Sequence, residues 1–362
     1  MPRKFPRKIN RIVIKVGSSL IANYQMKPRH AHLKSLVEQI VNLRRKKIEV
    51  ILVSSGAIVL GMGELAIKRR PMDLSSLQAL AAVGQSVLMR KYMDLFKKSG
   101  EKCAQILLTW DDFNDRLRFN NARNTFKAML GRKIVPIVNE NDTISTEEIK
   151  FGDNDKLSAL VASLVEADLL VILSDVEGFY NPTDTDKKLF QEIKEITKEI
   201  EGMAHGSTNK NISKGGMSAK LEAVKIASHA KIPTIIAHGE QEEVISRILK
   251  GERIGTYFCE KEEKLIAKKH WISFGVKPKG TLIVDDGAKK ALLKGGVSLL
   301  LPGISRCEGH FKREDVVVVA DIDNNEIARG IINYSSTELS QISDKKGKPE
   351  AIHCDDLVLG KR

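Results

Sequence analysis

The sequence has few cysteines, few aromatic residues and no long apolar run. Its four cysteines, Cys103, Cys259, Cys307 and Cys354, lie far apart, so neither a paired metal-binding spacing nor a disulfide framework is expected. This low cysteine content favours a reducing compartment, and we expect a cytoplasmic protein. No apolar run reaches about 18 residues, and no apolar segment follows the basic N-terminus, so neither a membrane span nor a secretory signal is expected.

Aliphatic residues, in contrast, are abundant. Hydrophobic residues make up 42% of the 362 positions although aromatic residues make up only 5%. This composition excludes a disordered or collagen-like chain, and the length predicts two or three domains. The net charge of +13 suggests anionic partners, either nucleic acid or small phosphorylated substrates. Because residues 271–362 contain 14 basic and 13 acidic residues, almost all of the surplus lies in the rest of the chain.

The first 255 residues alternate short apolar runs with amphipathic segments. The apolar runs predict strands at 11–16, 49–53, 104–109, 134–138, 168–173 and 234–237. The amphipathic segments predict helices at 32–46, 77–96, 116–130, 157–165, 217–230 and 242–249. Apolar strands that alternate with helices are typical of an α/β domain, so we expect an open, mostly parallel sheet sandwiched by helices.

The pattern changes after Gly255. Residues 256–275 are charged and weakly periodic, which predicts a linker. Residues 276–362 contain short apolar segments closed by turn residues, which predict strands at 281–284, 298–301, 316–320, 326–332 and 357–359 and hence a small β-rich domain. At the other end of the chain, the basic arm Arg3–Arg11 is expected to be a solvated tail.

Small residues follow the ends of several predicted strands, where open parallel sheets bind their ligands. Gly17 follows the first strand, Ser55 and Gly56 follow the second, and Ser174 follows the fifth. Small residues let the backbone approach a phosphate closely, although a single glycine at a strand end is more often only a turn. Their joint occurrence favours a site for a nucleotide.

Two further features indicate chemistry at this edge. Lys15 lies inside an apolar strand, and buried lysines are rare unless they have a partner. The run from Gly152 to Asp155 (GDND) offers carboxylate and amide oxygens that can accept from an ammonium group or hold Mg²⁺, although such a run is equally typical of a surface turn. Neither a P-loop nor the protein-kinase motifs occur, so a phosphotransferase with this sequence would belong to another class.

Seven motifs within residues 10–255 resemble those of the glutamate 5-kinases of the amino acid kinase superfamily. They are IKVGSS (14–19), VSSGAI (53–58), AAVGQS (81–86), PIVNEND (136–142), FGDNDKLSALVA (151–162), LSDVEGFY (173–180) and KGGMSAK (214–220). The pairing of NEND with GDND separates this family from acetylglutamate, carbamate, uridylate and aspartate kinases. VDDGA (284–288), SLLLPGI (298–304), ARGIINYSS (328–336) and IHCDD (352–356) resemble the PUA domain that many members carry.

The resemblance implies ATP-dependent phosphorylation of L-glutamate to L-glutamate 5-phosphate, the first step of proline biosynthesis. It implies Lys15, Lys220 and Asp155 as the catalytic residues, with the lysines contacting phosphates and the aspartate orienting them. The residues implied for glutamate are Ser55, Asn139, Asp142, Asp153 and Asn154. Those implied for the nucleotide are Lys15, Ser174, Asp175, Lys214, Gly215, Gly216, Met217, Ser218, Ala219 and Lys220.

The expected cofactors are ATP and Mg²⁺, with Mg²⁺ arriving on ATP and no protein side chain assigned as its ligand. The superfamily usually forms dimers or tetramers, so the resemblance implies a homo-oligomer. Two alternatives stay open: a nucleic-acid-binding protein, suggested by the PUA resemblance and the charge, and an amino acid kinase with another substrate. Nucleic acid is not expected as the main partner, because the C-terminal part is nearly neutral and aromatic residues are few.

Four positions depart from the family pattern. Lys214 stands in the glycine-rich segment where the usual form is Gly-Thr-Gly-Gly-Met, and Ala219 stands before Lys220 in place of a threonine. In the C-terminal part, Glu314 stands where glycine is usual and Cys354 where arginine is usual. The first two departures are expected to alter nucleotide affinity, and the last two weaken an RNA-binding role for the C-terminal domain.

Overall fold

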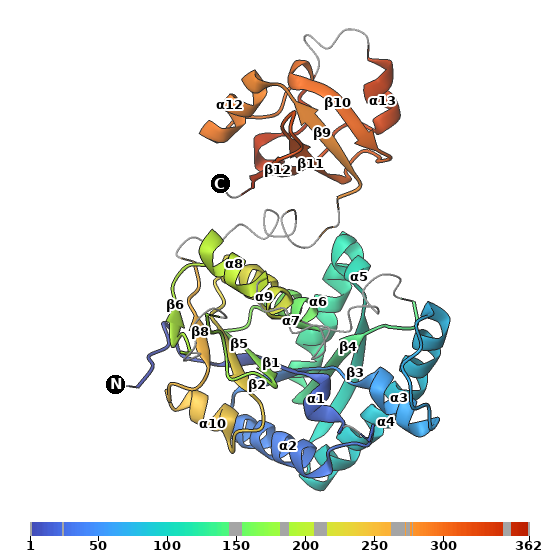
Figure 1. Cartoon of the computed structure of the whole chain (residues 1–362), viewed down its shortest axis with the longest axis vertical. Helices are drawn as coiled ribbons and strands as arrows, with labels where there is room; N and C mark the ends of the chain where they lie inside the picture. The colour runs from blue at the N-terminus through green and yellow to red at the C-terminus, as the bar shows by residue number, and fades with distance from the viewer. Residues whose placement is uncertain are drawn as a thin grey trace. The chain divides into compact units, whose positions relative to one another are not determined.

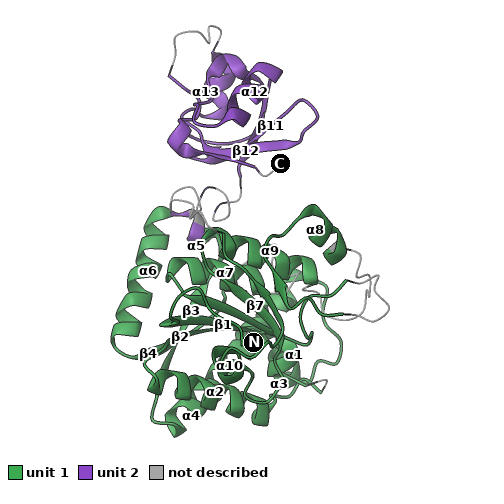
Figure 2. Cartoon of the chain, turned by 90° about the vertical axis from the view of Figure 1, so that its left-hand side faces the viewer, with its two compact units in different colours: residues 1–112, 116–264 green, residues 113–115, 265–362 purple. Residues whose placement is uncertain are grey.

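A computed structural model of the chain describes residues 2–23, 25–144, 154–181, 188–205, 216–261, 272, 276, 278–342 and 349–360. The chain forms two compact units, one of residues 1–112 and 116–264 and the other of residues 113–115 and 265–362 (Figures 1 and 2). Each unit has its own sheet and its own hydrophobic core. Among the described helices, none is both long enough and apolar enough to cross a membrane.

An eight-stranded sheet organises the larger unit, in the order β3-β4-β2-β1-β5-β7-β8-β6. Its strands are β1 (Arg11–Val16), β2 (Glu49–Ser54), β3 (Lys102–Leu108), β4 (Ile134–Glu140), β5 (Leu169–Ser174), β6 (Glu192–Ile193), β7 (Thr234–His238) and β8 (Thr256–Phe258). Strand β8 runs antiparallel to β7, and the other described neighbours pair in parallel. The predicted open, mostly parallel sheet is confirmed.

Helices cover both faces of this sheet (Figure 1). The described helices between β1 and β8 in the chain are α1 (Ser18–Ile21), α2 (His30–Arg45), α3 (Ala57–Glu64), α4 (Leu74–Lys98), α5 (Trp110–Asn114), α6 (Arg116–Gly131), α7 (Asp155–Leu164), α8 (Lys198–His205), α9 (Met217–His229) and α10 (Val244–Leu249). Helices α2 and α10 lie on one face, whereas α7 packs against α9, β1 and β5 on the other. Each face of the central strands is therefore shielded from water, which is why their sequences are almost wholly apolar.

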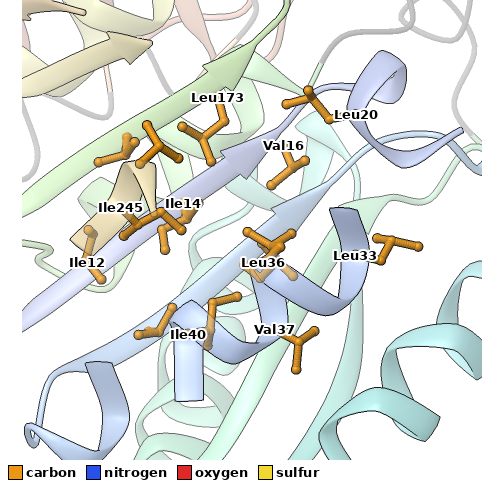
Figure 3. Close-up of a cluster of buried hydrophobic side chains, with 14 of the residues drawn as sticks. Ile12, Ile14, Val16, Leu20, Leu33, Leu36, Val37, Ile40, Leu173 and Ile245 are labelled. Atoms are coloured by element: carbon orange, nitrogen blue, oxygen red, sulfur yellow. The ribbon is translucent and has the colours of Figure 1, made fainter. Parts of the chain in front are cut away.

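The central strand β1 is buried on both faces. Ile12, Ile14 and Val16 point into one apolar cluster, which also contains Leu36 of α2 and Ile245 of α10 (Figure 3). Because side chains alternate along a strand, the intervening Lys15 points to the opposite face, toward α7 and α9. The strand pattern thus places a lysine in the interior of an α/β sandwich.

The N-terminal arm is not the solvated tail that its charge suggested. The backbone N–H of Arg3 donates to the carbonyl of Gly251 at 2.6 Å, and its guanidinium carbon lies 5.3 Å from the centre of the Tyr257 ring. The guanidinium of Arg7 donates to the carbonyl of Lys231 at 2.5 Å. Part of the positive surplus therefore stabilises the fold by satisfying backbone carbonyls.

Strand β8 lies inside the range 256–275 that was expected to be a linker. Its three residues are buried, and they pair with β7 on one side and β6 on the other. A run of three residues is too short to show a period, so the sequence pattern could not distinguish it from a loop.

A five-stranded sheet organises the smaller unit, in the order β10-β9-β11-β12-β13. Its elements are β9 (Gly280–Val284), α12 (Asp286–Lys294), β10 (Ile304–Gly309), β11 (Val316–Ala320), β12 (Glu326–Ile331), α13 (Ser336–Gln341) and β13 (Leu357–Leu359). The β-rich domain is confirmed, but the strand predicted at 298–301 is wrong. Leu299 makes only an isolated bridge to Ile352, and Leu301–Gly303 is a short 3₁₀ helix that contains Pro302, a residue suited to a first helical turn.

Candidate active site

Strand β1 lies between strands that the chain adds on its two sides, so its carboxyl end marks a switch point of the sheet. The chain places β2 on one side of β1 and β5 on the other, and such a switch point is where open α/β sheets bind ligands. Gly17, directly after β1, donates its N–H to the carbonyl of Leu173 at 3.0 Å and so ties the ends of β1 and β5 together. The candidate site is built at this edge.

A buried triad of charges lies beneath the edge. The Nζ atom of Lys15 is 2.5 Å from Oδ1 of Asp155, and the Nζ atom of Lys220 is 3.0 Å from Oδ2 of the same carboxylate. Asp155 is fully buried, and Lys15 and Lys220 are only 2% and 5% exposed. One carboxylate therefore holds two ammonium groups, and together the three side chains carry a net positive charge.

Each member of the triad comes from a different element. Lys15 is on β1, Asp155 is the first residue of α7, and Lys220 is in the first turns of α9, which begins after Gly216. The N-terminus of a helix favours a negative charge, so α7 itself stabilises the carboxylate that joins the two lysines. The net positive charge of these three buried side chains favours an anion such as phosphate at this place.

A chain of amide hydrogen bonds adjoins the triad. The Nδ2 atom of Asn154 donates to Oδ1 of Asn139 at 2.6 Å and to the carbonyl of Ser54 at 2.9 Å. Asn139 in turn donates its Nδ2 to Oε1 of Gln85 at 2.7 Å. Because each amide is held by its neighbour, the side chains of α7, β4 and α4 are fixed in orientation relative to one another.

A small pocket opens beside these amides. It is lined by Ser18, Ser55, Gly56, Ala57, Ile58, Val59, Arg70, Asn139, Glu140, Asp142 and Asn154. Within the described part of the chain, the buried Oγ of Ser55 has no hydrogen-bond partner, which suits a hydroxyl that bonds a ligand. Asn154 and Asp155 are consecutive residues, so this pocket adjoins the lysine triad.

Two opposite charges line the pocket and interact with each other. Burial raises the pKa of Asp142 to about 6, and the positive charge of Arg70 opposes that rise. Burial also lowers the pKa of Arg70, which the charge of Asp142 counteracts. Both groups are thus partly removed from water, where an ionic contact with a ligand is stronger than at an exposed surface.

The structure brings most of the predicted site residues to one edge of the sheet. Ser55, Asn139, Asp142 and Asn154 surround the pocket. Ser174 ends β5, and its hydroxyl donates to Oδ1 of Asp175 at 3.0 Å. Gly216 is the N-cap of α9, whose first residues are Met217, Ser218 and Ala219. Asp153, Lys214 and Gly215 lie outside the described residues.

Two residues near the pocket were not predicted from the sequence. Gln85 belongs to the AAVGQS motif, yet nothing in its own spacing indicated that it holds Asn139. Arg70 lies in a run of charged residues before a proline, a pattern that is typical of a solvated loop. Only the folded chain shows that this one arginine lines the pocket.

The pattern of the amino acid kinase family matches residues 10–238. The chain belongs to the amino acid kinase family. Residues 280–353 match the PUA domain, so this family member carries one. A glutamate 5-kinase of Dictyoglomus turgidum is 45% identical over 367 residues, and one of a Marinomonas species is 44% identical over 366 residues. Each alignment covers 97% of this chain and 98% of the relative. Among solved structures, a UMP kinase of Bacillus anthracis matches with a TM-score of 0.47 at 16% identity, over 72% of this chain and 100% of that chain.

Proposed function

We propose that the protein transfers the γ-phosphoryl group of ATP to the side-chain carboxylate of L-glutamate, giving ADP and L-glutamate 5-phosphate, the first step of proline biosynthesis. The buried triad of Lys15, Asp155 and Lys220 beside a polar pocket is the observation that carries this proposal. Relatives that align over almost the whole chain are glutamate 5-kinases, which supports the same substrate.

The acceptor needs no general base. The side-chain carboxyl of glutamate has an unperturbed pKa near 4.3, so it is already ionised at neutral pH. The obstacle is repulsion between this anion and the anionic phosphoryl group, which is about 4 kcal/mol for one pair of unit charges at 4 Å and an effective dielectric of 20. Catalysis at this site therefore depends on placing positive charge where the two anions meet.

The lysines supply that charge. An oxygen of the glutamate carboxylate attacks the γ-phosphorus, the bond to the bridging oxygen breaks, and ADP leaves with the electron pair, so no proton is transferred. We assign Lys15 and Lys220 to the phosphoryl oxygens, where charge spreads in the transition state. Asp155 holds both ammonium groups in place and is therefore a positioning residue.

The remaining residues are assigned to the two substrates, one set to glutamate and the other to the nucleotide. We assign Ser55, Asn139, Asp142, Asp153 and Asn154 to glutamate, whose ammonium group needs acceptors. We assign Ser174, Asp175 and Lys214, Gly215, Gly216, Met217, Ser218 and Ala219 to the nucleotide, which enters as its Mg²⁺ complex. The N–H groups of Met217 and Ser218, in the first turn of α9, suit phosphate oxygens. We assign the charge of Lys214 to the nucleotide, whereas Ala219 lacks the hydroxyl that a threonine would offer.

Assembly and domain roles complete the proposal. We expect a homo-oligomer, a dimer or a tetramer, which light scattering after size-exclusion chromatography would measure. We place catalysis in the larger unit, with the linker and the PUA-like domain of residues 276–362 following it.

Replacing one lysine tests the mechanism directly. Lys220→Met keeps the apolar stem in its buried position but removes the charge, so we expect kcat to fall by about 10²–10³-fold with the fold intact. The measurement is formation of glutamyl hydroxamate from ATP, L-glutamate and hydroxylamine. Lys225→Met is the matched control, because Lys225 is on the same helix but pairs with Glu201. Near-normal turnover by Lys220→Met would refute the assigned role.

A substrate panel tests the acceptor. We expect ATP consumption with L-glutamate, and little with N-acetylglutamate, aspartate or carbamate. Acylation removes the ammonium charge that Asp142 is proposed to bind, so N-acetylglutamate is the most informative of the four. A preference for any other acceptor would contradict the proposed function while leaving the family assignment unchanged.

A further inference from the structure

The pocket beside the triad contains one cation. Among the described residues that line it, Arg70 alone is positively charged, whereas Glu140 and Asp142 are acidic. Lys15 and Lys220 do not line this pocket and are held by Asp155. Arg70 therefore adds a cation to this pocket besides the two lysines, and the charges of Arg70 and Asp142 act on each other.

A free amino acid carries one negative and one positive group, which can pair with the guanidinium of Arg70 and the carboxylate of Asp142. Its α-carbon bears an ammonium group and a carboxylate side by side, which complements a carboxylate and a guanidinium that line the same pocket. We propose that Arg70 binds the α-carboxylate of L-glutamate while Asp142 binds the ammonium group, and that this pair selects a free α-amino acid. The inference rests on the function proposed above and adds a specificity-determining residue to it.

The residues next to the pocket support this orientation of the substrate. The end next to Asn154 adjoins Asp155 and the two lysines, so the reacting carboxylate belongs there. We place the α-carboxylate at Arg70, the cation among the described residues that line the pocket. The start of α3 also lines the pocket at Gly56, Ala57 and Ile58, and a helix N-terminus adds partial positive charge for a second carboxylate.

The chemistry of the side chain suits the task. A guanidinium offers donors in a planar fork that matches a carboxylate with two parallel hydrogen bonds. Arg70 is only partly exposed, so part of the cost of removing it from water is already met before the substrate arrives. The competing interpretation is that Arg70 only keeps Asp142 ionised and never touches the substrate.

The experiment compares two substrates that differ in one charge. L-Isoglutamine has the shape of L-glutamate and the same reacting carboxylate, but a neutral amide replaces its α-carboxylate. We expect Arg70→Gln to raise the KM for L-glutamate by about 10–100-fold, with kcat and the KM for ATP changed less than about threefold. The KM of isoglutamine, or its inhibition constant where turnover is too slow, should change less than about threefold. Arg70→Lys should recover part of the loss.

The controls separate the possible failures. Arg69→Gln removes a neighbouring exposed charge that does not line the pocket, and it should leave all constants unchanged. Equal losses for glutamate and isoglutamine in Arg70→Gln would overturn the inference, because Arg70 would then act through Asp142. An unchanged glutamate KM in Arg70→Gln and Arg70→Lys would also overturn it. Failure of the proposed function would show differently, as no glutamate-dependent ADP formation by the unchanged protein.

Discussion

A carboxyl group that is largely buried keeps its proton to a higher pH than usual. For Asp142, burial raises the pKa to about 6, and Arg70 only partly opposes this effect. The group is therefore charged at neutral pH but close to its titration. Since the proposed partner of this carboxylate is the ammonium group of the substrate, the protonation state of one residue should control substrate capture.

The pH dependence of kcat/KM for L-glutamate tests this coupling. A raised pKa means that the carboxylate form is present above pH 6 and is lost as the pH falls through 6. We expect kcat/KM to fall by about tenfold for each unit below that value. Asp142→Asn should be less active at pH 8 and should lack this limb. The terminal phosphate of ATP also titrates near pH 6, so the ratio of the two proteins at each pH is the informative quantity. A constant ratio from pH 5 to 8 would contradict the assignment.

The sequence predicts a role for some single residues and not for others. Lys15 could be selected because a lysine inside an apolar strand is rare, and the fold gives it a partner in Asp155. Arg70 could not be selected, because nothing distinguishes it locally from Arg69. Glu314, which stands where glycine is usual, adopts a φ of +69°, and its N–H donates to the carbonyl oxygen of Ile332 at 2.8 Å. The turn therefore keeps the left-handed backbone conformation although its residue is not a glycine.

Two helices position one wall of the pocket. Helices α3 and α4 pack closely at Gly61 and Gly84, where a β-carbon on Gly84 would lie 1.7 Å from the carbonyl oxygen of Ala57. A β-carbon on Gly61 would lie 2.0 Å from the carbonyl oxygen of Leu80. Both clashes are with backbone atoms that cannot rotate away. The crossing therefore fixes the start of α3, which contributes Ala57 and Ile58 to the pocket.

Gly84→Ala tests the importance of this crossing. The added methyl group has to push the helices apart, so we expect a loss of roughly 2–4 kcal/mol in the free energy of unfolding, at the upper end of typical overpacking. The KM for L-glutamate should rise as the start of α3 moves. Urea unfolding and steady-state kinetics measure the two effects. Gly202→Ala in α8 is the matched control, since its β-carbon would meet no atom within 4 Å, and it should be neutral or slightly stabilising. Equal behaviour of the two variants would contradict the argument.

The elements that the sequence predicted well are those with a strong repeating pattern. Five central strands, β1, β2, β4, β5 and β7, are almost wholly apolar because helices cover them on both faces. Strands β6 and β8 are too short to show a pattern, and their pairing depends on distant residues. The segment 298–301 is apolar because it is partly buried in the smaller core, not because it pairs along its length.

The two units have separate hydrophobic cores. The core of the larger unit joins β1 with α2, α4 and α10, whereas that of the smaller unit joins β9, β11 and β12 with residues such as Leu299 and Ile352. No residue belongs to both of these clusters. The triad and the pocket lie wholly within the larger unit. The stability of the smaller unit should therefore be separable from catalysis.

Leu282→Ala examines that separation. Leu282 is fully buried in β9, so the cavity should lower the free energy of unfolding of the smaller unit by about 2–5 kcal/mol. Hydrogen exchange should become faster in peptides from β9, β11 and β12 and stay unchanged in peptides from β1, β2 and β5, with kcat/KM for L-glutamate unaltered. Leu52→Ala, in β2 of the other core, should show the opposite distribution and reduce activity. Faster exchange throughout the chain of Leu282→Ala would mean that the two cores unfold as one, and catalysis would then depend on both.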